Sequence, residues 1–150
     1  MNKKITAIVS PDGPLLKADK NMLYETLLNL LHNAIRFSPY NSEVTIQISD
    51  AKGETSCMIE NDASKVHHKV RIEVIDAGPG VNPSRKADIF QTPELAGEGK
   101  LCLGMRCSKL LMDAIGGTIG FEEANGLTNR GARFFVEVPM ILEQLTGRNY

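Results

Sequence analysis

The stretch from Asp19 to Pro39 limits the fold of this 150-residue chain most, because it carries a full set of helix signals. Asp19 is a good N-cap, and the residue before a proline avoids helical backbone angles, so Ser38-Pro39 is a stop. Between these ends an apolar side chain recurs every three or four residues, at Leu23, Leu27, Leu30, Ala34 and Phe37. We therefore predict one long helix with a single apolar stripe.

Strand-like segments lie on both sides of this helix. They alternate apolar with polar residues or are rich in β-branched residues, and they are residues 4–9, 43–48, 56–59, 70–75, 118–122 and 132–138. The segment 56–59 is the weakest of them. The last two segments flank Asn125-Gly126, which is a turn sequence, and are predicted to form an antiparallel hairpin.

Two further helices are predicted between the strands. Residues 83–90 have a proline near their start, and residues 101–115 end at Gly116-Gly117, which is a helix stop. This order of elements predicts one domain over residues 1–150, an α/β sandwich of two layers. It has one mixed, mainly antiparallel sheet with its helices packed on one face. Residues 49–69 are polar and mixed, and we predict either a regulatory insertion or a plain surface excursion there, of which the excursion is the commoner case.

Composition excludes several classes of function. Hydrophobic residues make up 42% and charged residues 23%, as in ordinary globular proteins, and the net charge of -1 argues against a nucleic-acid partner or an anionic membrane surface. No apolar run approaches the roughly 20 residues that cross a bilayer. The three cysteines lack CxxC spacing, which argues against zinc and against a disulfide framework. We expect a cytoplasmic domain, which leaves open a membrane anchor elsewhere in a longer protein.

The predicted long helix has a second, polar face. Asn29, Asn33 and Arg36 are spaced four and three residues apart, so they line up about 100° away from the stripe that contains Leu30. Asparagine costs about 0.7 kcal/mol relative to alanine inside a helix, and such breaks of local rules tend to mark functional positions. The alternative is a solvated polar face, which is the commoner explanation for an isolated pair of asparagines.

Asp76-Ala77-Gly78-Pro79-Gly80 follows a predicted strand. Glycines such as Gly78 and Gly80 let the main chain approach a ligand closely. A carboxylate only accepts hydrogen bonds, which suits an exocyclic amino group such as that of adenine. The alternative is a plain strand-ending turn, since Asp, Gly and Pro are all turn residues.

A third motif runs from Gly97 to Gly104, where a loop leads into the second long helix. Free N–H groups and the positive end of a helix dipole bind phosphate. The alternative is a helix that only packs, through its apolar residues Leu103, Leu110, Leu111 and Ile115.

In this order the segments resemble the catalytic, ATP-binding domain of sensor histidine kinases, a family that shares its nucleotide fold with DNA gyrase, a class of heat-shock chaperones and the mismatch-repair ATPases. The resemblance covers about residues 5–139. The motifs that carry it are an N box at residues 29–38, a first glycine box at 76–81 and an Ile-Phe segment at 88–90. A closing hairpin follows, with matching segments at 116–119 and 131–139.

The resemblance implies a role for each polar residue of the N box. Asn33 would be a ligand of Mg²⁺ between the phosphates, because a hard cation prefers oxygen ligands. Asn29 would support the phosphate site, and Arg36 would contact phosphate oxygens. Phe37 would pack near the base.

In the glycine boxes, the resemblance implies that Asp76 binds the adenine amino group while Gly78 and Gly80 shape that pocket. The helix start around Gly104 would face the phosphates. The aligned Lys100-Leu101-Cys102-Leu103-Gly104 departs from the family's Gly-x-Gly-Leu-Gly. Either Gly97 and Gly99 replace the lost glycines in a shifted register, or Lys100 supplies a cation.

The implied function is transfer of the ATP γ-phosphoryl group to a histidine on a separate dimerisation domain, with a response regulator as indirect partner. His32, His67 and His68 are not expected to be the acceptor. The altered box and the short lid at residues 91–99 favour an alternative, a degenerate non-catalytic module that acts through protein contacts. A stand-alone serine kinase of the anti-sigma type is a third reading, and the wording of the N box favours it least.

Overall fold

A computed structural model of the chain describes residues 4–8, 16–51, 69–91, 100–124 and 131–140. The helices are α1 (Lys20–Phe37) and α2 (Lys100–Ala114), with a 3₁₀ turn, η1, at Pro83–Arg85. The strands are β1 (Lys4–Ile8), β2 (Glu43–Asp50), β3 (Lys69–Ile75), β4 (Thr118–Glu123) and β5 (Ala132–Pro139). Each predicted long helix and hairpin strand is present within one or two residues of its expected ends.

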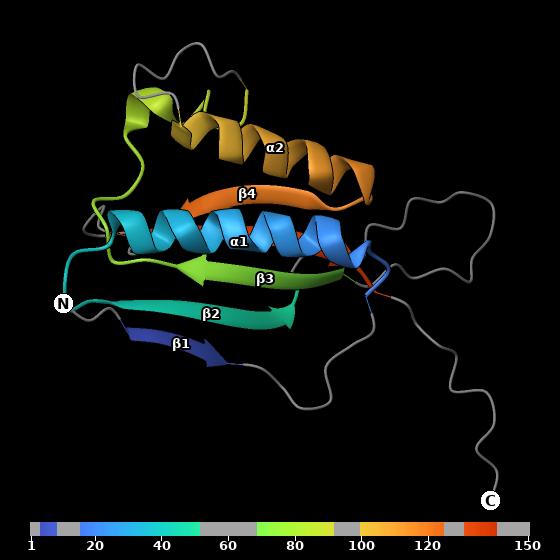
Figure 1. Ribbon diagram of the computed structural model, residues 1–150, viewed down its shortest axis with the longest axis horizontal. Helices are drawn as coiled ribbons and strands as arrows, with labels where there is room; N and C mark the ends of the chain where they lie inside the picture. Colours follow the sequence, from blue (N-terminus) through green and yellow to red (C-terminus); the bar gives the residue numbers. More distant parts are fainter. Residues whose placement is uncertain (1–3, 9–15, 52–68, 92–99, 125–130, 141–150) are drawn as a thin grey trace, which may run out of the picture.

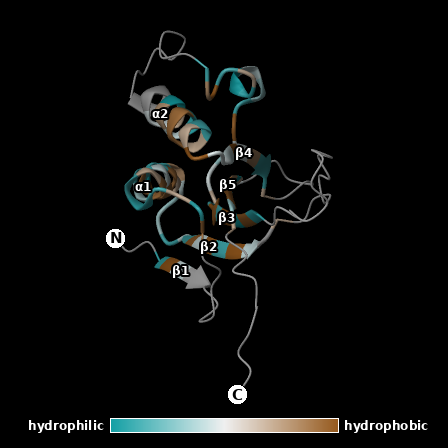
Figure 2. Ribbon diagram, turned by 90° about the vertical axis from the view of Figure 1, so that its right-hand side faces the viewer, coloured by the Kyte–Doolittle hydropathy of each residue, from teal (hydrophilic) through white to brown (hydrophobic). Residues whose placement is uncertain are grey.

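The five strands form one sheet in the order β1-β2-β3-β5-β4 (Figure 1). β1 pairs parallel with β2, and the other three pairings are antiparallel. Both long helices lie on the same side of this sheet, α1 over β3 and α2 over β4 (Figure 2). The predicted two-layer α/β sandwich with a mixed, mainly antiparallel sheet is therefore confirmed.

The capping predicted for α1 is present at its start. The Asp19 carboxylate accepts hydrogen bonds from the backbone N–H groups of Asn21 and Met22, at 2.9 and 3.0 Å. These bonds satisfy two of the donors that the first turn of a helix leaves unpaired. At the other end Ser38 has extended backbone angles, as expected before Pro39.

The core lies between the helices and the middle of the sheet. Most of its buried hydrophobic residues alternate along β3 and β5 or recur on α1 and α2, namely Leu30, Ala34, Val70, Ile72, Val74, Met105, Met112, Phe134, Val136 and Val138. Leu23 and Leu27 of the predicted stripe pack against this core, but Phe37 is 40% exposed. Phe37 is therefore not a core residue, and it occupies the last position of α1.

The opposite face of the sheet is held by an ion-pair cluster around Arg71. Its guanidinium lies 3.6 Å from the ring centroid of Phe135 and pairs with the carboxylates of Glu73, Glu122 and Glu137. These residues come from β3, β4 and β5, so the cluster fixes the same three strands that the core joins from the other side.

The helix predicted at residues 83–90 is wrong in its type and length. The chain makes one 3₁₀ turn at Pro83–Arg85 and then successive i→i+3 turns, such as Gln91 N–H to the Asp88 carbonyl at 2.9 Å. A segment this short has too few i→i−4 bonds to repay helix nucleation.

Several other predictions meet the limits of the described residues. β2 reaches Asp50 and β3 begins at Lys69, so the ends of the predicted insertion 49–69 belong to paired strands. The remainder of that segment, including the strand expected at 56–59, lies outside the described residues. The same holds for residues 92–99 of the predicted lid, with Gly97 and Gly99, and for the Asn125-Gly126 turn.

Candidate functional site

Asp76 lies directly after β3 with its side chain turned into the protein, where it is 8% exposed. Its Oδ1 accepts hydrogen bonds from the backbone N–H groups of Gly78 and Ala132, at 2.8 and 3.0 Å. Within the described residues Oδ2 makes no hydrogen bond, and it is not among the fully buried atoms. One carboxylate oxygen thus fixes the loop, and the other remains open to a donor from outside.

The charge state of Asp76 reflects this environment. Burial raises the pKa of the carboxyl group, and the hydrogen bonds from Gly78 and Ala132 act in the opposite direction. A hydrogen-bond donor that reaches the free oxygen would stabilise the charged form of this buried carboxyl group.

The loop at residues 76–80 is pressed against the end of α1. A Cβ atom on Gly78 would lie 2.9 Å from the carbonyl oxygen of Phe37, so no larger residue fits without movement. The backbone N–H of Ala77 donates to the Ser38 hydroxyl at 3.4 Å. Gly80 has a positive φ of 79°, a conformation that favours glycine. The close approach of Gly78 is to α1, whereas the approach to a ligand that the sequence predicts for both glycines stays a prediction.

α2 meets α1 near its middle, at Asn29. The Asn29 Nδ2 group donates to the Ser108 hydroxyl at 3.2 Å. A Cβ atom on Gly104 would lie 3.8 Å from Asn29 Cγ, which is ordinary contact distance. Gly104 was expected at the helix start, but α2 begins at Lys100, so Gly104 lies about one turn inside the helix. The side chains of residues 100–103, Lys100 among them, are outside the described part of the chain.

These two contacts bracket the polar face of α1. Phe37 and Asn29 are eight positions apart, which corresponds to about 12 Å along a helix axis. Asn33 lies midway between them, half-buried, and its side chain makes no hydrogen bond within the described residues. Both glycine boxes are therefore adjacent to the same helix, with the free carboxamide of Asn33 between them.

The other N-box residues are more exposed. Arg36 and Phe37 face solvent, and the Arg36 guanidinium lies 5.4 Å from the ring centroid of Phe37. His32 is exposed on α1, while His67 and His68 lie outside the described residues. Sequence reasoning missed Ser108, and it placed Ser38 in the N box without foreseeing its hydrogen bond to the Asp76 loop.

The sequence matches the family described as histidine kinase-, DNA gyrase B- and HSP90-like ATPase over residues 18–142. This range includes the N box and the Asp76 loop. The chain belongs to this ATPase family. The predicted membership of this nucleotide-binding family is thereby confirmed.

Relatives with curated names are sensory proteins, and some of them are named histidine kinases. The ATPase domain is 30% identical to the sensory/regulatory protein RpfC of Xanthomonas campestris over 141 residues, which are 89% of this chain and 18% of the relative. It is also 30% identical to the sensory histidine kinase/phosphatase NtrB of Klebsiella oxytoca, over 85% of this chain and 35% of the relative. The chain thus spans about a third or less of the length of these relatives.

Solved structures agree with this assignment. Full-length ShkA in complex with AMPPNP has a TM-score of 0.67 and 30% identity, over 92% of this chain and 26% of ShkA. The catalytic domain of histidine kinase ThkA has a TM-score of 0.65 at 22% identity, over 91% of this chain and 80% of that one, which supports the fold alone.

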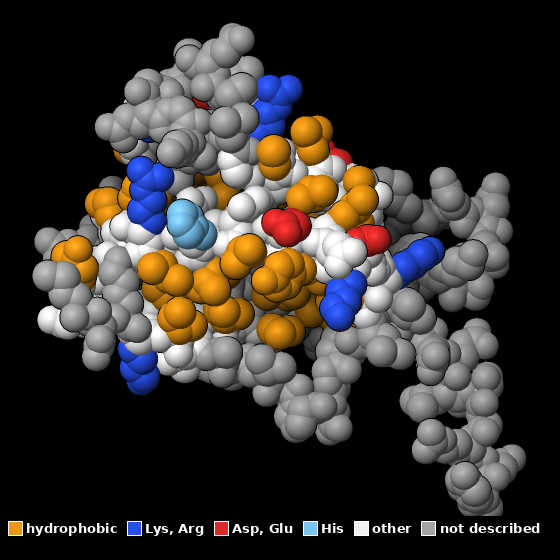
Figure 3. All heavy atoms as spheres, in the orientation of Figure 1, with side chains coloured by type: hydrophobic (Ala, Val, Ile, Leu, Met, Phe, Trp, Pro, Cys, Tyr) orange, Lys and Arg blue, Asp and Glu red, His pale blue; other side chains and the backbone are white. Residues whose placement is uncertain are grey.

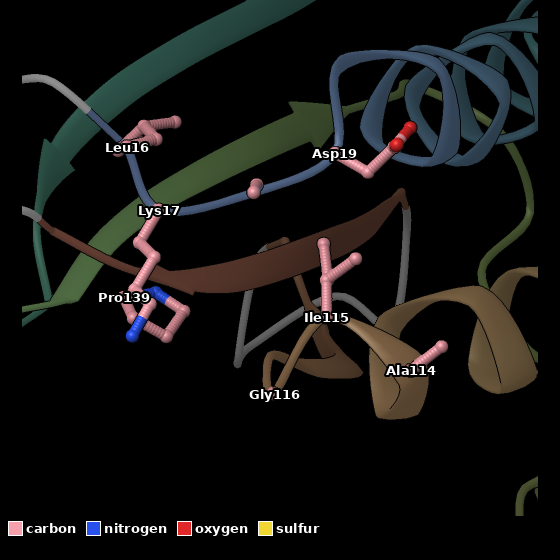
Figure 4. A pocket seen from close by; sticks show the side chains of 8 residues that line it. Leu16, Lys17, Asp19, Ala114, Ile115, Gly116 and Pro139 are labelled. Atoms are coloured by element: carbon pink, nitrogen blue, oxygen red, sulfur yellow. The ribbon is translucent and has the colours of Figure 1, made fainter.

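Two surfaces of the ATPase domain lie away from this site. An open pocket of about 610 Å³ lies at the opposite end of the helix layer, where Asp19 and Lys17 precede α1 and Ile115 follows α2 (Figure 4).

The outer surface of the helices mixes apolar and charged side chains (Figure 3), and the apolar ones include the exposed Tyr24 and Leu28. Within the described residues, no helix is both long and apolar enough to cross a membrane.

Proposed function

We propose that this chain is the ATP-binding catalytic domain of a two-component sensor histidine kinase. In this proposal it binds ATP with Mg²⁺ and transfers the γ-phosphoryl group to a histidine on a separate dimerisation domain. A response regulator is its indirect partner. The observation that carries the proposal is the position of Asn33. It lies on α1 midway between Asn29, which bonds to α2, and Phe37, whose backbone carbonyl the Asp76 loop approaches.

The Asp76 loop fits the adenine end of the nucleotide. The open Oδ2 of Asp76 can accept a hydrogen bond from an exocyclic amino group, while Oδ1 is already held by two backbone N–H groups. Gly78 and Gly80 keep this wall of the pocket free of side chains. Phe37 is exposed beside the loop and can cover the base.

The polar face of α1 fits the phosphate end. The carboxamide of Asn33 offers an oxygen ligand, which is the type that Mg²⁺ prefers, and Asn29, one helical turn earlier, would support the phosphate site. Arg36 is exposed and can bind phosphate oxygens through its planar guanidinium. Bound Mg²⁺ would neutralise phosphate charge, which is its general part in phosphoryl transfer. Lys100, at the start of α2, would add a cation at this end.

Transfer requires little covalent chemistry from the protein. These residues would hold the triphosphate in position, and an acceptor histidine must be neutral to use its lone pair. We assign the acceptor histidine to a separate domain, as the resemblance implies. His32 is exposed on α1 but belongs to the nucleotide-binding segment itself.

The experiment is binding of ATP with Mg²⁺, measured by titration calorimetry, to the wild type and to Asn33→Ala. Binding that needs Mg²⁺ and falls about tenfold or more in the variant is the expected result, if losing the amide oxygen costs as much as losing a hydrogen bond to a charged group, about 1.5–3 kcal/mol. Glu25→Gln, an exposed change elsewhere on α1, is the matched control. Equal affinity of wild type and Asn33→Ala would reject the assignment of Asn33.

The altered glycine box supports a second candidate, a degenerate module without catalysis. Lys100 and Cys102 replace two glycines of the family pattern. Nucleotide at a hundred times its dissociation constant should stabilise a binding domain by about 2.7 kcal/mol, which a thermal shift detects. No shift at millimolar ATP and Mg²⁺, followed by a shift in the Lys100→Gly/Cys102→Gly variant, would establish the degenerate module.

A further inference from the structure

The buried face of α2 contains one residue that does not belong in an apolar core. Met105, Ser108 and Met112 are spaced three and four residues apart and are 1%, 0% and 0% exposed. The methionines fit the stripe, but a hydroxyl group in its middle breaks the pattern. A buried hydroxyl requires a hydrogen-bond partner, and a local exception of this kind tends to occur near functional sites.

The partner of Ser108 is Asn29 on the other helix. Asn29 Nδ2 donates to the Ser108 hydroxyl oxygen at 3.2 Å, and the two residues are 79 positions apart in sequence. The bond therefore joins α1 directly to α2.

This bond fixes the orientation of the Asn29 carboxamide, because it turns the amide nitrogen toward Ser108. An amide nitrogen can only donate, and only the amide oxygen can accept a hydrogen bond or bind a cation. With Nδ2 turned to Ser108, Oδ1 lies on the side of Gly104, 3.9 Å from the position of a Cβ atom there. Within the described residues, no side-chain atom other than those of Asn29 lies within 4 Å of that position.

We propose that Ser108 is a positioning residue for the phosphate end of the nucleotide site. Its hydroxyl holds the Asn29 carboxamide so that the amide oxygen faces the phosphates and their cation. The inference rests on the proposed function, because it concerns binding of nucleotide through Asn29. The competing explanation is that a small residue at position 108 only lets the two helices approach each other.

A double-mutant cycle separates the two explanations. Ser108→Ala should weaken binding of ATP with Mg²⁺ about three- to tenfold, which is the loss of one hydrogen bond. In the Asn29→Ala background the same change should have no further effect, because the group that Ser108 positions is gone. A role in packing alone predicts the same loss in both backgrounds, or no loss in either, and both results would overturn the proposal.

Thr26 supplies a matched control. It is also a fully buried hydroxyl, but it donates to the Met22 carbonyl of its own helix at 2.9 Å and touches neither Asn29 nor Ser108 through a hydrogen bond. Thr26→Val removes a buried hydroxyl while keeping the shape of the side chain. Its affinity for ATP with Mg²⁺ should equal that of the wild type, and a loss as large as that of Ser108→Ala would contradict a specific role of Ser108.

A nucleotide-free readout separates failure of this inference from failure of the proposed function. In the wild type the side-chain NH₂ resonances of Asn29 should show slowed hydrogen exchange, and Ser108→Ala should abolish this protection. Protected resonances in a wild type that binds no nucleotide would reject the proposed function and, with it, the role of Ser108. Nucleotide binding with equal affinity in wild type and Ser108→Ala would reject the role of Ser108 alone.

Discussion

The two glycine boxes contact α1 in different ways. At the Asp76 loop the contact is between backbones, and a Cβ atom on Gly78 would lie 2.9 Å from the Phe37 carbonyl oxygen. At α2 a Cβ atom on Gly104 would meet, among the described residues, only Asn29, at 3.8 Å. The first glycine is therefore required by the fold itself, whereas any requirement for the second must come from a ligand.

This difference bears on the departures at residues 100–104. Changes in the first box would cost stability in every state of the domain, so its pattern is tied to folding. A box that is constrained only by the bound phosphates can lose glycines, as at Lys100 and Cys102, without loss of the fold. The confirmed fold beside an altered second box agrees with this view.

The largest expected effect is on nucleotide affinity, from removal of the carboxylate charge of Asp76. Asp76→Asn keeps the acceptor for the N–H groups of Gly78 and Ala132 but replaces the open oxygen with a donor. We expect the protein to fold and nucleotide affinity to fall about 10- to 100-fold, because a hydrogen bond to a charged group contributes about 1.5–3 kcal/mol. Calorimetry measures the affinity, and Glu122→Gln on the opposite face of the sheet is a suitable control. Unchanged affinity would remove Asp76 from the site.

The next effect concerns stability without nucleotide. Gly78→Ala forces the loop away from Phe37, and we expect the free energy of unfolding to fall by about 1–3 kcal/mol, as for other overpacked sites. Urea denaturation checks this value. A variant as stable as the wild type would show that the loop can move away from α1 freely, and the contrast between the boxes would then be wrong.

Gly104→Ala should act in the opposite direction on stability. The added methyl group has room, and alanine is favoured over glycine inside a helix by about 0.5–1 kcal/mol, so the nucleotide-free protein should become more stable. If phosphates approach α2 at this turn, affinity for ATP should fall in the same variant. Lower stability of the nucleotide-free variant would mean that Gly104 is required by the protein and not by a ligand.

The smallest effect is the pH dependence that Asp76 contributes. Its pKa in the folded protein is raised above the usual value, mainly by burial, so the folded state binds more protons than the unfolded state between the two pKa values. The stability that this group contributes is therefore fully present below the unfolded pKa and is lost as pH rises through the folded pKa. Urea denaturation of wild type and Asp76→Asn across this range should show the wild type losing stability relative to the variant. A constant difference would contradict the raised pKa.

Much of the fold could be predicted from the sequence because its signals are local. The N-cap at Asp19, the alternation along residues 70–75 and the Gly116-Gly117 stop each act within a few residues, and the corresponding elements are present. The segment 83–90 failed because its proline and apolar residues fit a 3₁₀ turn as well as a helix.

The site depends on contacts between distant segments. No local pattern places Ser108 against Asn29 or Ala132 against Asp76, since these pairs form only after the helices and the sheet have packed. Motif order supplied Asp76, Asn29 and Asn33. The bonds that hold two of these residues in place, from Ala132 to Asp76 and from Asn29 to Ser108, were found only in the structure.

A crystal structure with Mg²⁺ and a non-hydrolysable ATP analogue tests the central proposal most directly. It should show the adenine amino group about 3 Å from the Asp76 carboxylate and Mg²⁺ about 2.1 Å from the Asn33 amide oxygen, with the triphosphate running along α1 between them. A nucleotide that contacts one of these side chains while the other points to solvent or to a separate region would contradict the proposal.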